Sequence, residues 1–271
     1  MATTTAVART QPKGRLKHYL SLSDFEEAAR RRLPRPIFRY VSGAAEDCAS
    51  LHDNRAAFWE IGFVTRVLRN VSARSQQVEL FGRTYASPFG IAPMGISALS
   101  AYRGDLVLAS AAAEASVPMI MSGSSLIPLE EVIAQSPDTW FQAYLPGEVD
   151  RIEALVDRVD GAGVQTLVLT VDTAVLANRE NNIRAGFSTP LRPNLRLAWD
   201  GLTHPRCLLS TGLRTLLLHG MPHFENSYAT RGAPILSSRV TRDFGAKDHL
   251  DWEHLALIRR KWKRTLVVKG L

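Results

Sequence analysis

The stretch from residue 166 to residue 180 constrains the fold more than any other part of the chain. Its first six residues, Thr-Leu-Val-Leu-Thr-Val, are apolar or β-branched, which predicts a strand buried on both faces, as in a parallel sheet covered by helices. Polar groups follow at once, with Asp172 directly behind the strand and Arg179 seven residues later. This layout is typical of a barrel enzyme, whose chemistry lies at the carboxyl ends of its strands. A buried strand followed by an ordinary polar loop is the alternative.

Length and composition limit the other possibilities. A chain of 271 residues can form one large domain or two small ones, and it contains no apolar run long enough for a membrane-spanning helix. The two cysteines, Cys48 and Cys207, lack metal-ligand spacing and suit a reducing cytoplasm. The net charge of +7 favours anionic partners, but no nucleic-acid-binding motif is present. We therefore expect neither a nucleic-acid partner nor a metal site.

The amino-terminal part divides into a leader and the start of a domain. Residues 1–20 begin with a Thr- and Ala-rich run and lack the apolar core of a signal peptide, which predicts a disordered leader. A single domain is expected to cover residues 21–271. Ser23, which precedes several acids, is the expected N-cap of a helix that Pro34 ends or restarts. Residues 54–68 mix helical and extended signals.

From residue 88 onward, apolar segments and helical segments alternate. The expected strands cover residues 88–95, 117–123, 140–146, 166–171 and 265–270. The expected helices cover residues 105–116, 129–134, 149–159 and 250–263. Strands and helices in this order indicate βαβ units around a parallel sheet. A flavodoxin-like open sheet is the alternative to a barrel, although no Gly-x-Gly-x-x-Gly motif follows the first strand.

Each expected strand ends in residues that can approach or hydrogen-bond a flat polar ligand. In chain order these residues are Pro93, Met94 and Gly95, then Ser122, then Gln142 and Tyr144, then Thr170 and Asp172, and finally Lys269. The carboxyl ends of parallel strands meet on one side of a sheet, so we expect these side chains to converge on a single site.

A long insertion separates the last two expected strands. It covers about residues 181–247 and combines apolar runs with five arginines: Arg184, Arg192, Arg196, Arg206 and Arg214. Loops of this length are usually functional or disordered. A basic and apolar excursion fits association with a membrane surface. A packed lid or a subunit contact is the alternative.

Seven motifs together resemble the FMN-dependent α-hydroxy-acid dehydrogenases and oxidases, such as lactate and mandelate dehydrogenases and glycolate oxidase. The motifs are Tyr40 with the Gly-Ala-Ala-Glu-Asp turn at 43–47, Asn-Arg at 54–55, Ile-Ala-Pro-Met-Gly at 91–95, Trp-Phe-Gln-Ala-Tyr at 140–144, Leu-Thr-Val-Asp-Thr at 169–173, Asn-Arg-Glu at 178–180 and Leu-Val-Val-Lys-Gly at 266–270. They follow the family's order and spacing over nearly the whole chain. His-Pro-Arg at 204–206 and His-Gly-Met-Pro at 219–222 resemble the membrane-associated mandelate and lactate dehydrogenase branch most. The resemblance implies a TIM (β/α)8 barrel that binds FMN.

The resemblance also implies roles in cofactor binding for the strand ends. The roles are backbone contact with the isoalloxazine for Pro93, Met94 and Gly95, and hydrogen bonds to its polar edge for Ser122, Gln142 and Thr170. Lys269 would lie near N1 and O2, where reduction places negative charge that a fixed cation stabilises. A lysine that snorkels to the surface is the alternative. Gly95 stands where oxidases of the family often carry alanine, which favours a quinone or cytochrome over oxygen as electron acceptor.

The substrate implied by the resemblance is a small L-2-hydroxy acid of the lactate or mandelate type. Arg179 would hold its carboxylate, for which a planar bidentate donor is suited. The Tyr40 and Tyr144 hydroxyls would donate to that carboxylate and to the charge developing at C2. Asp172 would orient and stabilise a catalytic imidazolium, unless it is only a cap at the end of the strand.

The catalytic base itself is expected beyond this chain. In the family, the histidine lies in a Ser-Asn-His-Gly-Gly-Arg segment after the fifth strand, whereas this sequence ends at Leu271. His204, His219 and His223 lack that context, so we expect them to be structural. We therefore expect about five of the eight βα units here, and no turnover by the 271-residue chain alone.

Several alternatives stay open at this point. An inactive truncated or decayed fragment with residual flavin binding is the main rival. A different FMN barrel class, of the dihydroorotate or inosinate type, is a third reading, against which Tyr40 and Arg179 argue. For the complete protein, relatives suggest a homotetramer in the cytoplasm, with the insertion as a peripheral contact on the inner face of the cytoplasmic membrane.

Overall fold

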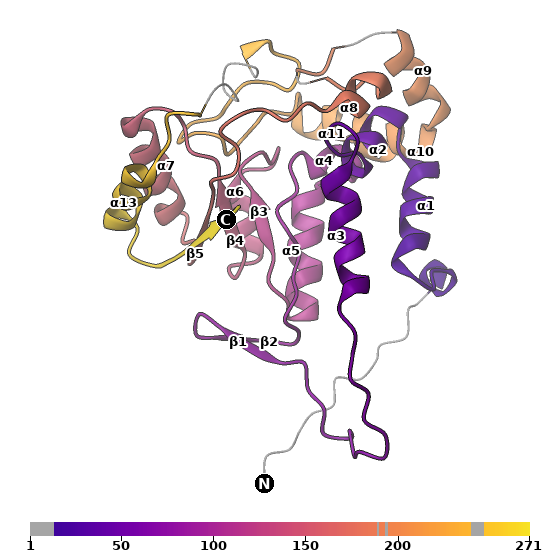
Figure 1. Cartoon of the computed structure of the whole chain (residues 1–271). Coiled ribbons are helices and arrows are strands. Elements are labelled where there is room, and N and C mark those ends of the chain that lie inside the picture. Colours follow the sequence, from indigo (N-terminus) through magenta and orange to yellow (C-terminus); the bar gives the residue numbers. More distant parts are fainter. Residues whose placement is uncertain (1–13, 189, 193–194, 240–246) are drawn as a thin grey trace.

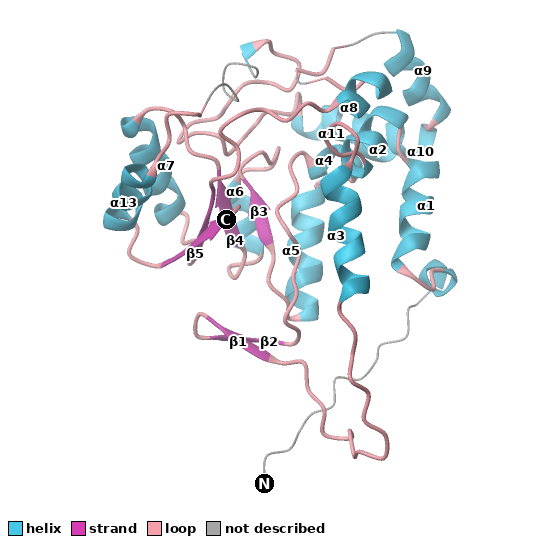
Figure 2. Ribbon diagram, in the orientation of Figure 1, coloured by secondary structure: helices cyan, strands magenta, loops and turns pink. Residues whose placement is uncertain are grey.

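The computed structural model describes residues 14–188, 190–192, 195–239 and 247–271. Its centre is a four-stranded parallel sheet with a helix before or between successive strands (Figures 1 and 2). The strands are β3 (Ile120–Ser122), β4 (Trp140–Ala143), β5 (Thr166–Thr170) and β6 (Thr265–Lys269). The helices of these units are α5 (Gly104–Ala115), α6 (Leu129–Gln135), α7 (Val149–Gly161) and α13 (Trp252–Lys261). All four expected βα pairs are therefore present within a few residues of the predicted bounds.

The order of the strands distinguishes between the two expected architectures. The strands follow one another as β3-β4-β5-β6, and each pair is parallel. The strand expected at 88–95 is reduced to a single parallel bridge between Ile91 and Met119, so that prediction was too generous. Its backbone still lies beside β3, because Ile120 N–H donates to the Ile91 carbonyl at 2.9 Å. A sequential order without reversal is that of a barrel, whereas a flavodoxin-like sheet reverses its order.

The core lies between this sheet and its helices. All five residues of β5 are buried, as expected for a strand covered on both faces. Helix α7 buries Ile152, Leu155, Val156 and Val159, which share one helical face. Helices α7 and α13 pack side by side (Figure 1), and Trp262, just after α13, is almost completely buried. The ends of the strands are thus held by packing that extends from β3 to β6.

Three helices precede the sheet: α1 (Leu22–Arg32), α2 (Arg35–Ser42) and α3 (Ala49–Glu60). The prediction of Ser23 as N-cap was wrong, since the cap is Ser21. The Asp24 carboxylate accepts hydrogen bonds from the backbone N–H groups of Leu20 and Ser21, and these bonds fix the earlier start. Pro34 is the N-cap of α2, so the proline restarts the helix rather than ending it. The ambiguous residues 54–68 are helical up to Glu60 and irregular beyond it.

A small antiparallel hairpin, β1 (Val78–Leu80) and β2 (Arg83–Tyr85), was not expected from the sequence. It lies at the end of the molecule opposite to α8–α11 (Figure 2). The signal is weak because each strand has only three residues and only Tyr85 is buried. Tyr85 anchors the hairpin to the sheet, since its hydroxyl accepts a hydrogen bond from the Trp140 indole at 3.2 Å.

The expected insertion contains most of the remaining helices. They are α8 (Glu180–Ala185), α9 (Leu195–Thr203), α10 (Pro205–Cys207), the π-helical turn η2 (Leu208–Leu213) and α11 (Arg214–His219). These elements and the short α4 (Ser97–Ser100) lie on the side where the strands end (Figure 1). Residues 189, 193–194 and 240–246 of the insertion lie outside the described part. None of the described helices has the length and hydrophobicity needed to cross a bilayer.

Of the leader expected over residues 1–20, residues 1–13 lie outside the described part of the chain. Residues Gly14–His18 form a short 3-10 helix, η1. The ring of Tyr19 stacks on that of Phe25 with a centroid distance of 4.5 Å, so this part packs against α1.

Candidate active site

Polar side chains meet at the carboxyl ends of β3, β4 and β5, as the sequence predicted. Ser122 and Gln142 are partners in the register of β3 and β4. The Ser122 hydroxyl donates to the Gln142 Oε1 atom at 3.3 Å, and the Gly123 N–H donates to the same oxygen at 3.4 Å. Thr170 ends β5 and is also buried. We refer to Ser122, Gln142 and Thr170 as the strand-tip cluster.

Two atoms of the strand-tip cluster have no hydrogen-bond partner among the residues that the structure describes. They are the Gln142 Nε2 and the Thr170 Oγ1, both fully buried. A buried polar group without a partner is costly, and native structures contain few of them. A donor and a hydroxyl left unsatisfied at neighbouring strand ends fit a ligand with polar atoms along one edge. The pyrimidine edge of an isoalloxazine has this character, so the residues present fit the flavin that the sequence suggested.

The segment Pro93–Gly95 lies beside this cluster. The Ile96 N–H donates to the Ser124 carbonyl at 3.2 Å, which fixes the segment against the loop after β3. A Cβ atom added at Gly95 would stand 3.4 Å from the Tyr40 hydroxyl and 4.0 Å from the Ser122 hydroxyl. Gly95 therefore lies between the strand-tip cluster and Tyr40. Met94 is 41% exposed, so its backbone rather than its side chain belongs to the candidate site.

A second group of predicted residues gathers around Tyr144, two residues beyond Gln142. Burial raises the pKa of the Tyr144 hydroxyl most, the nearby Tyr40 and Asp172 raise it further, and Arg179 lowers it. Burial also raises the pKa of Tyr40, and Arg179 opposes this shift. Both phenols therefore remain protonated at neutral pH and can donate hydrogen bonds. We refer to Tyr40, Tyr144 and Arg179 as the carboxylate cluster.

Contacts between helix α2 and the segment leading into α8 bring this cluster together. The Glu46 N–H donates to the Asn178 carbonyl at 3.0 Å, and the Asn181 side chain donates to the Arg39 carbonyl at 2.9 Å. Gly43 allows the approach, since a Cβ atom there would overlap the Asn181 amide. Tyr40 and Arg179 are distant in sequence and become neighbours through these bonds. The ring of Phe187 supports Tyr40 from the side, with a centroid distance of 4.6 Å.

Asp172 and Lys269 lie together beyond β5 and β6. The Lys269 ammonium is 3.8 Å from the Asp172 carboxylate, and the two side chains are 45% and 46% exposed. The Val171 N–H donates to the Lys269 carbonyl at 3.0 Å, which holds the two strand ends in register. Asp172 also acts on Tyr144. All the predicted acids, cations and phenols are therefore connected to one region at the strand ends.

Sequence reasoning missed Lys247 as a member of this region. Its ammonium lies 5.0 Å from the centroid of the Tyr144 ring, and burial lowers the pKa of Lys247 to about 8. Lys247 and Thr170 line a cavity of about 240 Å³ between the ends of β5 and β6. No strand or helix pattern surrounds Lys247 in the sequence, so nothing local marks it as part of a site.

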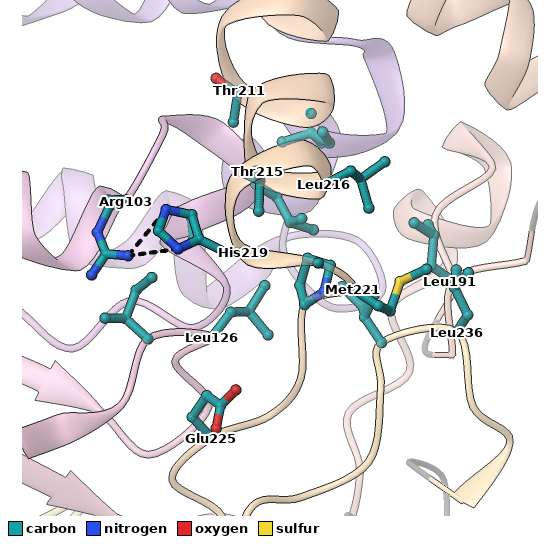
Figure 3. A pocket seen from close by; sticks show the side chains of 18 of the residues that line it. Arg103, Leu126, Leu191, Thr211, Thr215, Leu216, His219, Met221, Glu225 and Leu236 are labelled. Atoms are coloured by element: carbon teal, nitrogen blue, oxygen red, sulfur yellow. Dashed lines mark hydrogen bonds between the residues drawn. The ribbon is translucent and has the colours of Figure 1, made fainter. Parts of the chain in front are cut away.

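A larger cavity, of which Figure 3 shows a close view, lies elsewhere and is lined mainly by residues of the insertion. It measures about 480 Å³, and side chains such as Leu126, Leu216 and Met221 line it. His219 closes one side, where its ring bonds the Tyr102 hydroxyl at 2.8 Å and approaches the Arg103 guanidinium at 3.4 Å. No residue of the strand-tip or carboxylate cluster lines this cavity.

The other two histidines of the insertion bond backbone carbonyls. The His204 ring bonds the Asp200 carbonyl at 2.8 Å, and the His223 ring bonds the Met221 carbonyl at 2.7 Å. Such contacts are those of structural side chains.

Comparison with known proteins identifies the family. A family model described as FMN-dependent dehydrogenase matches residues 29–271. The chain belongs to the FMN-dependent dehydrogenase family. This assignment accounts for the fold class, a (β/α)8 barrel, because the parallel sheet and sequential strand order are those of the solved barrels that resemble it.

Among the curated members of the FMN-dependent dehydrogenase family, two relatives illustrate the similarity. An L-lactate dehydrogenase of Pectobacterium atrosepticum is 34% identical over 253 residues, which cover 92% of this chain and 64% of that protein. An (S)-mandelate dehydrogenase of Pseudomonas putida is 32% identical over 258 residues, which cover 94% of this chain and 64% of that protein. The chain thus spans slightly less than two thirds of the length of these relatives.

Solved structures of the FMN-dependent dehydrogenase family agree. The chain superposes on (S)-mandelate dehydrogenase, described as a monotopic membrane protein, with a TM-score of 0.79 and 31% identity over 92% of this chain and 65% of that one. A mandelate oxidase superposes with a TM-score of 0.71 and 27% identity over 93% of this chain and 63% of that one. The backbone on which both clusters are arranged is therefore that of flavin enzymes.

Proposed function

We propose that this chain provides the flavin-edge and carboxylate-binding groups of an enzyme that oxidises small L-2-hydroxy acids to 2-oxo acids. The supporting observation is the pair of buried atoms without partners, Gln142 Nε2 and Thr170 Oγ1, beside a cluster of two protonated phenols and one arginine. The relatives named lactate and mandelate dehydrogenase act on acids of this class, as their names state.

The strand-tip cluster would hold the polar edge of FMN. Gln142 Nε2 would donate a hydrogen bond to the flavin, and the Thr170 hydroxyl would donate or accept another. Binding would therefore give both buried polar groups a partner. Lys269 would stabilise the negative charge that reduction places near N1 and O2. When bound, FMN supplies the acceptor for two electrons. Its binding therefore compensates for polar groups that the fold alone leaves unpaired.

The carboxylate cluster would hold the acid. Arg179 can form two parallel hydrogen bonds with a carboxylate, and the Tyr40 hydroxyl can add a third. Tyr144 is protonated and half-buried, so it can donate to the oxygen at C2 as charge develops there. Asp172 would orient the imidazolium of a histidine base. The groups around Tyr144 that shift its pKa in the described chain are two charged side chains and one phenol, without an imidazole.

Titration of the purified chain with FMN tests this proposal. Flavin fluorescence should be quenched on binding, and Gln142→Leu and Thr170→Val should each weaken binding. Gln165→Leu is a matched control, because Gln165 lies before β5 and bonds the Gly163 carbonyl. Equal affinities for the chain, both site variants and the control would contradict the proposal.

A second candidate function is binding of flavin and acid without turnover. It is supported by the buried Gln142 Nε2 and Thr170 Oγ1, which can hold a flavin edge whether or not turnover follows. Anaerobic mixing of the FMN-loaded chain with L-lactate or (S)-mandelate separates the two candidates. Loss of the yellow flavin absorbance at a family-like rate would show turnover by the chain itself, against our expectation. A bound but unchanged flavin supports binding without turnover.

For the complete enzyme, we propose a quinone or a cytochrome as electron acceptor, with oxygen as the alternative. Position 95 is narrow, since a Cβ atom there would stand 3.2 Å from the Ser124 Cβ and 3.4 Å from the Tyr40 hydroxyl, and the resemblance implies alanine there in many oxidases. Reoxidation of the reduced flavin measured with ubiquinone analogues, with cytochrome and in air-saturated buffer tests this choice. Reoxidation that is fastest in air would contradict it.

We further propose that the insertion binds a membrane surface peripherally, on the cytoplasmic side. Large apolar side chains of α9 and α11 are exposed: Leu195, Trp199, Leu202, Leu217 and Leu218. Two of the arginines of the insertion contact other residues of the protein. The Arg214 guanidinium lies 3.9 Å from the centroid of the Tyr102 ring, and the Arg184 guanidinium pairs with the Glu180 carboxylate at 2.6 Å. Flotation with anionic vesicles tests this proposal, and Trp199→Ser should reduce the bound fraction. If the insertion is a packed lid instead, the chain should not float with the vesicles.

The complete protein is proposed to form a homo-oligomer, as the sequence analysis expected for a tetramer. Segment 58–68 exposes large apolar side chains, among them Phe58, Trp59 and Phe63. Exposed apolar surface of this extent is typical of association surfaces. Light scattering on the purified protein gives the number of subunits, and a monomer would contradict the expectation.

A further inference from the structure

Lys247 is a largely buried cation next to the carboxylate cluster. Its ammonium lies over the Tyr144 ring at 5.0 Å, and its backbone N–H donates to the Ala174 carbonyl at 3.4 Å. Burial alone accounts for the lowered pKa of Lys247, at about 8, and no charged group of the described residues contributes to it. At neutral pH the side chain therefore carries a positive charge that the described chain leaves uncompensated.

Two acids of this region are already engaged. Asp251 lines the same cavity, but its carboxylate caps α13 by accepting the N–H of Glu253 at 3.0 Å and that of His254 at 3.3 Å. Asp172 lies 3.8 Å from the Lys269 ammonium. A lysine without a function in this position would extend its amine to solvent, since its flexible stem permits this. The Lys247 ammonium instead lies over an aromatic ring of the site.

We infer that Lys247 binds a second carboxylate of the substrate, so that the site accepts 2-hydroxy dicarboxylic acids. This inference rests on the proposed function, because it requires Arg179 and Tyr40 to hold the first carboxylate. Both cations act near Tyr144: Arg179 lowers the pKa of its hydroxyl, and the Lys247 ammonium lies 5.0 Å from the centroid of its ring. An acid held by Arg179 and lying along Tyr144 would extend its far end toward Lys247.

Only the far end of the acid would enter the cavity beside Lys247, because Tyr40, Tyr144 and Arg179 do not line it. The space lined by Lys247, Thr170 and Val268 measures about 240 Å³, which is below the roughly 300 Å³ at which pockets for drug-sized ligands begin. Apart from Lys247, Asp251 and two threonines, its walls are apolar. A carboxylate that enters this space has Lys247 as its charged partner, and a charge-assisted bond in such surroundings is stronger than one in water.

Calorimetric titration of the FMN-saturated chain with a matched pair of acids tests the inference. L-malate and L-2-hydroxybutyrate have the same number of carbons and differ by one carboxylate. We expect L-malate to bind about tenfold more tightly, as a charge-assisted hydrogen bond would give. Lys247→Met should remove this difference, and Lys247→Arg should retain most of it. Lys263→Met, a change of an exposed lysine, should have no effect.

Chemical labelling gives a second readout that does not depend on a variant. A lysine whose pKa is lowered reacts with acetic anhydride at neutral pH faster than surface lysines do. L-malate should protect Lys247 from acetylation, and L-2-hydroxybutyrate should not. Equal protection by both acids, or a preference for L-malate that persists in Lys247→Met, would overturn the inference.

The failure of the proposed function would look different. In that case neither acid would bind, or Arg179→Met would leave the affinity for both acids unchanged, and both proposals would fall. If both acids bind through Arg179 with equal affinity, only the role of Lys247 is refuted.

Discussion

The two clusters of the candidate site are held in different ways. Ser122, Gln142 and Thr170 end three adjacent strands and are almost completely buried, so sheet register fixes their spacing. Tyr40 and Arg179 lie on a helix and in a loop that only a few hydrogen bonds join, and Arg179 is exposed. The strand-tip cluster, fixed by the sheet, fits a cofactor of constant shape. The carboxylate cluster, held by fewer bonds, fits acids whose side chains differ.

This difference has an energetic side. The strand-tip cluster leaves neutral polar atoms without partners among the described residues, while near the carboxylate cluster the mostly buried Lys247 has no charged partner in that part of the chain. Buried charges cost more than buried neutral groups. The substrate side of the site should therefore respond more strongly to substitutions and to pH than the cofactor side does.

Arg179→Met should produce the largest effect. It removes a bidentate partner of the carboxylate and should weaken binding of L-lactate about 100-fold, or roughly 3 kcal/mol, without changing flavin affinity. Calorimetry with the acid and fluorescence titration with FMN measure the two affinities separately. Arg184→Met is the matched control, because Arg184 lies in the nearby helix α8 and pairs there with Glu180. Equal losses for both ligands would show that the clusters are not separate.

Lys247→Met should stabilise the folded chain at neutral pH. The lowering of the pKa from 10.5 to about 8 corresponds to roughly 3 kcal/mol, and partial exposure reduces the expected gain to roughly 2 kcal/mol. Since the folded state binds fewer protons than the unfolded state between these two values, the stability of the unchanged chain should rise with pH across that window.

The stability difference between Lys247→Met and the unchanged chain should therefore be greatest below pH 8 and shrink as the pH approaches 10.5. Urea denaturation at several pH values measures it. A difference that does not depend on pH would mean that the ammonium is not buried in solution.

Gln142→Leu should weaken FMN binding by about tenfold and lower the stability of the fold by only about 1 kcal/mol. The ligand loses the Nε2 donor, while the protein loses the Oε1 acceptor of two long hydrogen bonds, from the Ser122 hydroxyl at 3.3 Å and from the Gly123 N–H at 3.4 Å. Thermal unfolding without FMN and fluorescence titration with FMN give the two quantities. A large loss of stability would show instead that Gln142 mainly supports the sheet.

Gly95→Ala should have the smallest effect, a few-fold loss in affinity for the acid. The added methyl group would stand 3.2 Å from the Ser124 Cβ and 3.4 Å from the Tyr40 hydroxyl, so both must shift by a few tenths of an ångström. Binding of acids of increasing size to both forms measures the change. An unchanged affinity would place the substrate away from Gly95.

Periodicity predicted the strands β3 to β6 and the helices α5, α6, α7 and α13, because buried faces impose regular patterns on a sequence, but it did not predict the helices of the insertion, α8 to α11. The strand-tip residues could be named for the same reason, since a polar residue that ends an apolar run is conspicuous. The start of α1 was misplaced because Ser21 and Ser23 carry the same capping signal, and only the Asp24 carboxylate distinguishes them. The strand expected around Ile91 forms only one bridge. Its prolines have no N–H group to donate to a neighbouring strand, and its glycines weaken a strand because they have no side chain to pack.

Contacts between distant segments could not be predicted in this way. The approach of Tyr40 to Arg179 depends on the Asn181 side chain and on the lack of a Cβ atom at Gly43, neither of which follows a period. The family resemblance supplied the pairing instead. Lys247 was missed by both routes, since no motif contains it and its burial depends on the fold.

The position of β6 in the sheet has a practical consequence. This strand pairs with β5 on one side, and no described strand pairs with its other side. A row of backbone N–H and C=O groups with half-buried valines is a template on which a strand from another molecule can be added. For the 271-residue chain used in these titrations, self-association at this edge should grow with protein concentration, and a charged residue introduced on β6 should reduce it.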